Sequence, residues 1–190
     1  MKKFLTFLLL IPCVLCFSCN KKDTNSTSHV SDNVQKSVEP IIGMPNPIKP
    51  SSYNEILQTL GVSFSLPQNA QDISFSIISG EIGQAQFSWP IDEQKTAQCC
   101  VRVQPTGQIG LQDISGYYYT WKNSANVKVS YNDAVTKWTT LEDGTTVGIC
   151  IWWDAAPGIL YSVSMSDYAN EQNLTHLAQL VYEAQQGEVE

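Results

Sequence analysis

The middle of this chain alternates apolar with polar residues, which is the period of a β-strand with one buried face. The first two such runs lie at residues 73–77 and 84–89, and turn-forming residues at 79–81 separate them. A third run follows at 97–104. These patterns predict a hairpin and a third antiparallel strand, each with one apolar and one polar face.

Four further strands are predicted beyond a loop at residues 107–116. Asp143-Gly144 and Pro157-Gly158 are strong turn signals and separate the last three of them. The expected strands cover residues 127–131, 135–141, 147–153 and 159–165. The pattern therefore predicts about seven strands.

A short amphipathic helix is predicted before the first of these strands. Ser52 and Glu55 have the spacing of a capping box, and Gly61 suits the left-handed residue that ends a helix. The apolar positions between them fall on one side of the helix: Tyr53, Ile56, Leu57 and Leu60. We expect this side to pack on the rest of the domain.

A second amphipathic helix is predicted to close the domain. Asn170 and Asp167 are both candidates for its N-cap, and Gly187 marks its end. Its apolar stripe contains Leu174, Leu177, Ala178, Val181 and Ala184. Since strands and helices do not alternate, the predicted class is α+β: a curved antiparallel meander of about seven strands with an N-terminal and a C-terminal helix covering one face.

The first 18 residues predict export. Two lysines precede residues 4–18, an uncharged run that is shorter than the roughly 20 residues a membrane span needs and is typical of a secretory signal. The run ends in Ser18 and Cys19 and resembles a bacterial lipoprotein signal, in which a small residue precedes the cysteine that receives the lipid. We therefore expect a lipid on Cys19; the alternative is an ordinary signal peptide, cut nearby, that releases a soluble protein.

Residues 19–50 are predicted to form a flexible tether. They are rich in Asn, Ser, Thr and Lys and then in Pro, and they contain no apolar run at helix or strand spacing. Such a segment has too little apolar surface to offset the entropy of ordering. The remainder, residues 51–186, is long enough for one domain, and residues 187–190 are a short tail.

The charge balance disfavours a nucleic-acid partner. The chain has a net charge of −7, and only five basic residues follow residue 50: Lys95, Arg102, Lys122, Lys128 and Lys137. Binding to nucleic acid or to anionic lipid headgroups relies on clustered basic groups. We expect the N-terminal lipid, and not the domain surface, to make the contact with the membrane.

Three short phrases carry a family resemblance. They are Met44-Pro45-Asn46-Pro47-Ile48, Asp113-Ile114-Ser115-Gly116-Tyr117 and Tyr161-Ser162-Val163-Ser164. Across residues 43–181 the chain resembles a domain-of-unknown-function family of exported or membrane-tethered bacterial envelope proteins, often clostridial. The resemblance implies a fold and an address but no activity. The chain departs from the family where Trp138, Trp152 and Trp153 make the strands aromatic.

The reactive side chains are not placed as catalysis requires. His29 lies in the tether and His176 lies beside the apolar stripe of the last helix, so no nucleophile has an evident base. The carboxylate pairs Asp92-Glu93 and Glu142-Asp143 stand at predicted turns, where solvation accounts for them. Adjacent cysteines without a nearby His lack zinc-ligand spacing. We therefore expect no enzyme activity, no metal and no cofactor.

The aromatic residues are the candidate binding residues. If Trp138 and Trp152 lie on the sheet face away from the helices, they form an exposed patch suited to sugar rings or protein anchors. Tyr118 and Trp121, in and after the central loop, add to it. The alternative is that these residues fill a second core beneath the loop or the tether.

Three functional hypotheses follow. The first is a non-catalytic, lipid-anchored envelope module that binds a protein, peptide or glycan partner through the open sheet face. The second is a structural or sensing envelope domain with no ligand pocket, and the third is an enzyme with an unrecognised site. Exposed Trp138 and Trp152 favour the first, and buried ones favour the second.

The cysteines that follow the anchor allow one disulfide. By alternation Cys99 points toward the expected core, whereas Cys100 and Cys150 point away from the apolar faces of their strands. These two would form a bond if their strands lie side by side with Cα atoms within about 7 Å. In a simple meander two other strands separate them, and the bond is then impossible.

Overall fold

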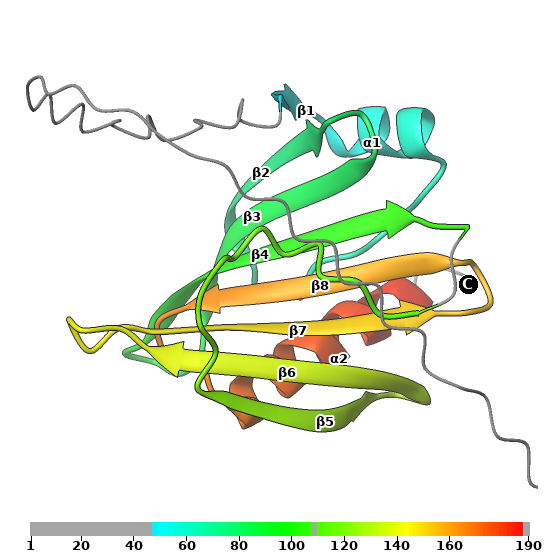
Figure 1. Ribbon diagram of the computed structural model, residues 1–190. Helices are drawn as coiled ribbons and strands as arrows, with labels where there is room; N and C mark the ends of the chain where they lie inside the picture. Colours follow the sequence, from blue (N-terminus) through cyan, green and yellow to red (C-terminus); the bar gives the residue numbers. More distant parts are fainter. Residues whose placement is uncertain (1–46, 108–109, 188–190) are drawn as a thin grey trace, which may run out of the picture. The chain divides into compact units, whose positions relative to one another are not determined.

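One antiparallel sheet of eight strands and two helices account for the residues that the computed structural model describes, 47–107 and 110–187 (Figure 1). This confirms the α+β class. The elements follow in the order β1 (Ile48–Ser51), α1 (Tyr53–Leu60), β2 (Gln71–Ile78), β3 (Ile82–Pro90), β4 (Thr96–Pro105), β5 (Asn123–Val129), β6 (Asn132–Thr140), β7 (Thr146–Asp154), β8 (Ile159–Ser166) and α2 (Glu171–Gly187).

The sheet departs from a simple meander at β4. The strand order is β1-β2-β3-β4-β8-β7-β6-β5, so β4 pairs with β8 and not with β5. The β4–β5 connection, residues 106–122, therefore takes the chain to the far edge of the sheet (Figure 1). The expectation of a meander was wrong here because alternation along a strand does not specify which distant strand becomes its neighbour.

The first strand begins inside the segment that we expected to be tether, and only its last residue, Ser51, belongs to the expected domain. Residues Ile48 to Ser51 pair antiparallel with Ile78 to Phe75 of β2. β1 is short, almost fully exposed and contains Pro50, which suits an edge strand. Such a strand has no apolar alternation, so the sequence pattern does not reveal it, and the folded domain begins before residue 51.

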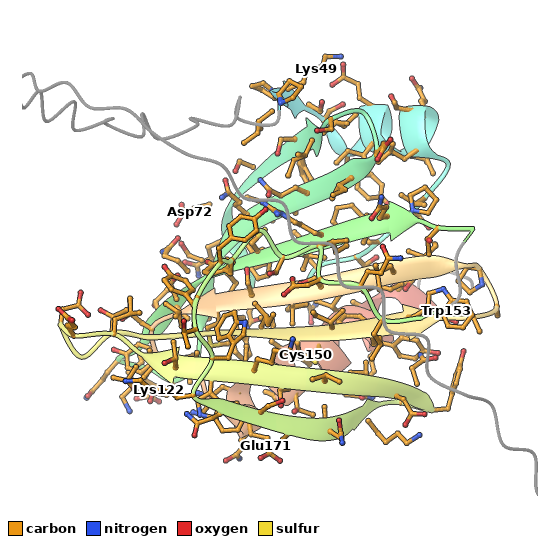
Figure 2. All side chains as sticks on the ribbon, viewed as in Figure 1. Lys49, Asp72, Lys122, Cys150, Trp153 and Glu171 are labelled. Atoms are coloured by element: carbon orange, nitrogen blue, oxygen red, sulfur yellow. The ribbon has the colours of Figure 1, made fainter. Side chains whose placement is uncertain are left out.

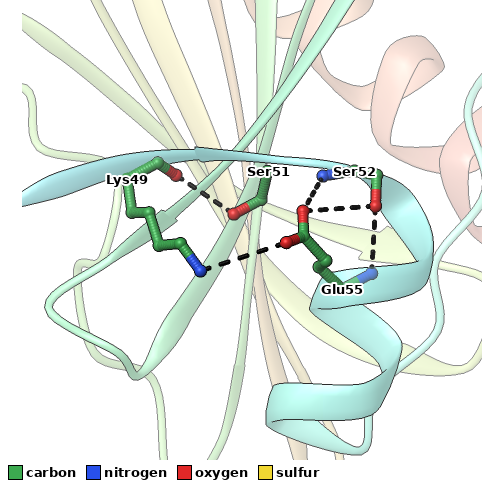
Figure 3. Close-up of polar contacts among 4 residues, drawn as sticks. All are labelled: Lys49, Ser51, Ser52 and Glu55. Atoms are coloured by element: carbon green, nitrogen blue, oxygen red, sulfur yellow. Dashed lines mark hydrogen bonds and ion pairs between the residues drawn. The ribbon is translucent and has the colours of Figure 1, made fainter.

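The capping box of α1 forms as the sequence predicts (Figure 3). The Ser52 hydroxyl accepts a hydrogen bond from the Glu55 N–H at 3.2 Å, and the Glu55 carboxylate accepts one from the Ser52 N–H at 2.8 Å. Lys49 of β1 lies 4.0 Å from the same carboxylate. Gly61 ends the helix at φ 67°, and its N–H donates to the Leu57 carbonyl. Local hydrogen bonding therefore determines both ends of this helix.

Both helices cover the same face of the sheet, here called the helix face. α1 contacts β2 and β3, while α2 contacts β5, β6, β7 and β8. Glycines allow the close approach: a Cβ on Gly83 would lie 2.7 Å from Ile56 of α1, and one on Gly148 would lie 2.6 Å from Leu174 of α2. The main core fills this layer and confirms that the helices cover one face.

The apolar stripe of α2 is buried as predicted. Leu174, Leu177, Ala178 and Val181 have no exposed surface, and Ala184 is half-buried. Asn170 is the N-cap, because its side-chain oxygen accepts a hydrogen bond from the Asn173 N–H at 2.9 Å. Of the two N-cap candidates, Asp167 is therefore wrong: it lies in the preceding turn at φ 67°.

A second, smaller core lies on the opposite face, here called the connection face. Four buried residues form it, with partly buried aromatic residues packed against them: Ile114, Ile149, Ile151 and Leu160, then Tyr117, Trp121 and Trp153. The β4–β5 connection supplies three of these residues. β7 is therefore buried on both faces, which explains its nearly continuous apolar sequence.

Candidate functional site

The proposed exposed tryptophan patch does not form. Trp152 is fully buried on the helix face, where its ring stacks on Tyr161 with centroids 5.0 Å apart. Trp138 lies on the same face and is half-buried against the main core. The prediction was wrong because both faces of β7 are apolar, and the helices cover the face of Trp152 and not that of Ile149 and Ile151.

The aromatic residues of the connection divide into two groups. The rings of Tyr117, Tyr119 and Trp121 follow one another at centroid distances of 5.7 and 5.8 Å. Trp121 packs against the second core, which agrees with the alternative of a small core beneath the connection. Tyr118 points away and is 95% exposed. None of these residues lies with Trp138 in a common site.

The cysteine pair is also separated. Cys150 belongs to the core on the helix face, and Cys100, which pairs with Ser164 of β8, points to the connection face. β8 lies between their two strands. The disulfide prediction is therefore wrong, and Cys99, Cys100 and Cys150 are all free and buried (Figure 2 labels Cys150). Two physical reasons combine: β8 separates the two strands, and the two side chains lie on opposite faces of the sheet.

Burial makes these thiols poor acids. It raises the pKa of Cys150 to about 12, and burial together with neighbouring Cys100 raises the pKa of Cys99 to about 12. The pKa of Cys100 rises to about 11, because burial outweighs the opposing charge of Arg102. A protonated, buried thiol is neither a nucleophile nor a metal ligand.

Arg102 is a residue whose role the sequence did not reveal. It is the only basic residue of β4, on the polar face of that strand. Its Nη1 donates to the Ile114 carbonyl at 3.0 Å, and its Nε donates to the Gln84 side chain at 2.8 Å. Gln84 in turn donates to the Ser76 hydroxyl. Arg102 thus ties the connection to three strands of the sheet.

The phrase Asp113-Ile114-Ser115-Gly116-Tyr117 forms the other half of this attachment. The Asp113 carboxylate accepts hydrogen bonds from the N–H and the hydroxyl of Ser115. Gly116 has φ 74° and lies against the Arg102 guanidinium, where a Cβ would collide with it. The Tyr117 hydroxyl lies 3.3 Å from the Ser166 hydroxyl. The phrase therefore has a structural role in fastening the connection to the sheet.

A groove on the helix face is the best candidate binding site. This α2–β5 groove has a volume of about 780 Å³ and is lined by Val127, Trp138, Asn170, Glu171, Gln172, Thr175, His176 and Gln179. Val127 comes from β5 and Trp138 comes from β6. Asn170 is the N-cap of α2, and the other five residues belong to α2 itself. Figure 2 shows Glu171 at the start of α2, close to β5. Trp138 is therefore a groove residue, although not in the patch expected for it.

The polar groups of the groove differ in how they are bonded. The Asn170 side chain caps α2, and Gln179 bonds the Ser130 N–H and the Glu183 carboxylate. By contrast, the side chains of Glu171 and Gln172 are exposed and have no hydrogen bond to any other described residue, and the buried hydroxyl of Thr175 is also without a partner there. The groove thus combines a tryptophan floor with free polar groups, as ligand sites commonly do.

The remaining candidates have structural explanations. Asp92 accepts a hydrogen bond from the Gln94 N–H and pairs with Lys95 at 3.2 Å, and both interactions hold the pKa of its carboxyl below the usual range. Asp143 accepts from the Thr145 N–H in the next turn. His176 is exposed, 5.7 Å from the Trp89 ring. Residues 47–107 and 110–187 contain no cluster of three His, Cys, Asp or Glu that would hold a metal.

Some residues named in the sequence predictions lie outside the part of the chain that the structure describes. Cys19 and His29 are outside the described residues. Within the described part of the chain, neither helix is long and apolar enough to cross a membrane. No protein-family model, no curated protein and no solved structure matches this chain. The family resemblance of residues 43–181 therefore stays a prediction.

Proposed function

We propose that this chain is a non-catalytic envelope module, held at a membrane by a lipid on Cys19, that binds a protein, peptide or glycan partner in the α2–β5 groove. The observation that carries the proposal is the half-buried Trp138 at the floor of a groove with unbonded polar groups on its wall. Tryptophan in a concave site is a frequent anchor for partners. The signal sequence and the polar segment after it support the proposed location at a membrane.

The chemistry of the described residues supports a binding role over catalysis. The three thiols are buried, with pKa values raised to about 11 or 12, so they are protonated at neutral pH. The groove contains one carboxylate, Glu171, and one imidazole, His176, but no residue arranged as a nucleophile beside them. An enzyme with an unrecognised site is therefore the weakest of the three hypotheses.

One observation favours the second hypothesis, a structural or sensing domain. Trp152 is fully buried, and the second core beneath the connection is filled by Trp121, Tyr117 and Ile114. The face on which we expected binding is thus largely packed. In this alternative the α2–β5 groove is a surface irregularity with no occupant.

Photo-cross-linking in the native envelope separates the two hypotheses. A photoreactive amino acid replaces Gln172, exposed on the wall of the groove, or Gln58, exposed on α1 and outside it. We expect irradiation to yield a defined adduct from position 172 and none from position 58. Absence of an adduct at position 172, or equal yields at both positions, would refute binding in the groove.

A further inference from the structure

The two edge strands of the described sheet, β1 and β5, are not equally protected against pairing with an additional strand. β1 has four residues and contains Lys49 and Pro50, both of which discourage pairing with another strand. β5 has seven residues, no proline and no register shift against β6. Its one lysine, Lys128, is neutralised by Asp133 at 2.7 Å. Of the two edges, β5 is therefore the one that remains open to an additional strand.

The backbone of β5 presents a regular row of hydrogen-bonding groups. The β5–β6 hairpin closes with Val129 opposite Asn132 across a two-residue turn. In such a hairpin the closing pair exchanges backbone hydrogen bonds, and every second residue before it faces the partner strand as well. The backbone N–H and C=O groups of the intervening residues, Ser124, Asn126 and Lys128, therefore point to the open edge.

The α2–β5 groove lies beside this row. Val127 of β5 forms part of its floor, and Trp138 lies on β6, the next strand inward. The residue of β5 that precedes Val127 on the helix face is Ala125, which is small. A side chain from a strand paired with β5 would therefore extend over Ala125, beside Asn123, which lies opposite Trp138, toward the Trp138 ring. In strand addition, backbone hydrogen bonds provide affinity and such pockets provide specificity.

The charge of the groove indicates which side chain it favours. Its lining includes Glu171, which is exposed and unpaired among the described residues, and includes no Lys or Arg. The whole chain has a net charge of −7. Electrostatic complementarity therefore favours a basic residue in the partner. The edge row favours a peptide over a glycan, since only a peptide has donors and acceptors at strand spacing.

We infer that the partner is an extended basic peptide segment that adds to the sheet along β5 and places an apolar side chain against Trp138 and a Lys or Arg near Glu171. This inference rests on the proposed function, because it specifies the occupant of the same groove. The occupant is a segment of about five to seven residues, because it must match the length of β5.

A peptide selection on the full chain in detergent micelles tests the inference. Random 12-residue peptides are displayed on mRNA and selected against the full chain, and their dissociation constants are then measured. We expect the selected peptides to alternate apolar with polar residues and to contain Lys or Arg. Failure to enrich any peptide above empty micelles would overturn strand addition.

Two variants at one position test the backbone row. Asn126→Pro removes an N–H that points to the open edge without removing a hydrogen bond to β6. Asn126→Ala removes only the side chain and is the matched control. We expect Asn126→Pro to weaken binding at least tenfold and Asn126→Ala to change it less than twofold. Equal affinities for both variants would contradict the inference.

Methylated peptides repeat the test on the unaltered protein. A backbone N-methyl group on the selected peptide should abolish binding at alternate positions only, namely those whose N–H faces β5. Insensitivity at every position would rule out strand addition even if Asn126→Pro fails to fold. If position 172 cross-links in the envelope but no peptide is selected, the proposed function survives and this inference fails. The inference fails in the same way if the cross-linked partner is degraded by a glycan hydrolase and resists protease.

Discussion

At the scale of single residues, burial on two different faces sets the chemistry of the cysteines. Cys99 and Cys150 face the helices and Cys100 faces the connection, and the pKa of each thiol is raised from about 9 to about 11 or 12. In the unfolded chain the same thiols ionise near their ordinary value. Folding is therefore linked to proton retention by these three residues at alkaline pH.

The first prediction follows from this linkage. Above pH 9 the unfolded chain releases thiol protons that the folded chain keeps, so the free energy of unfolding should fall by about 1.4 kcal/mol per thiol for each further pH unit. The protein to measure is the chain that begins at Asn20, because its only cysteines are these three. Its free energy of unfolding is measured with urea at several pH values between 8 and 10. A variant with all three replaced by alanine is the control and should lose less; equal pH dependence in both proteins would contradict the assignment.

The second residue-scale prediction concerns the anchor. Because Ser18-Cys19 ends the signal sequence, Cys19 should receive the lipid. Cells fed a labelled fatty-acid probe should mark the wild-type chain and should not mark Cys19→Ala. The matched control is Cys16→Ala, which leaves the expected attachment site in place and should be labelled like the wild type. Equal labelling of Cys19→Ala and the wild type would reject lipid attachment at Cys19.

At the scale of elements, the sequence was most informative where structure is determined locally. The capping box at Ser52, the left-handed Gly61 and the N-cap Asn170 are all formed from residues within a few positions of one another. Alternation located most strands for the same reason, but the strand expected at 127–131 was misplaced: β5 ends at Val129, and residues 130–131 form the turn to β6. The edge strand β1 was missed because its pairing with β2 depends on backbone contacts that its side-chain pattern does not show.

Leu177 tests the packing of α2. It has no exposed surface, so Leu177→Ala should lower the free energy of unfolding by about 2–5 kcal/mol through lost burial and a residual cavity. Leu57→Ala makes the same chemical change on α1, where the side chain is 42% exposed, and should cost far less. Chemical denaturation measures the free energy of unfolding of both variants. Similar losses of stability in the two would mean that α2 does not bury Leu177 against the sheet.

Gly116 tests the attachment of the connection. Its φ of 74° is unfavourable for alanine, and the new Cβ would collide with the Arg102 guanidinium. Gly116→Ala should therefore lower the free energy of unfolding by about 1–3 kcal/mol. It should also speed chymotrypsin cleavage at the exposed Tyr118. Gly107→Ala, where nothing lies within 4 Å of the added Cβ, is the control and should behave like the wild type.

At the scale of the whole molecule, the choice of sheet face limited prediction of the site. Both faces of β7 are apolar, so no local pattern shows which of them meets the helices. The helices cover the side of Trp152, and that choice buries Trp152 and places Cys150 on the face opposite to Cys100, in addition to the separation by β8. The groove could not be predicted either, because α2 and β5 are distant in sequence and meet only where α2 packs back across the strands from β8 to β5. Of the four aromatic residues proposed for binding, only Trp138 lies in it.

A partner that occupies the α2–β5 groove and the β5 edge in the native envelope should change the exchange of the β5 amides. Amide hydrogen exchange, read by mass spectrometry, compares the full chain in intact envelopes with the chain purified in detergent. We predict slower exchange in β5 in the envelope, because its outward N–H groups are then bonded, and unchanged exchange in α1. Exchange in β5 that is equally fast in both preparations would contradict this occupancy.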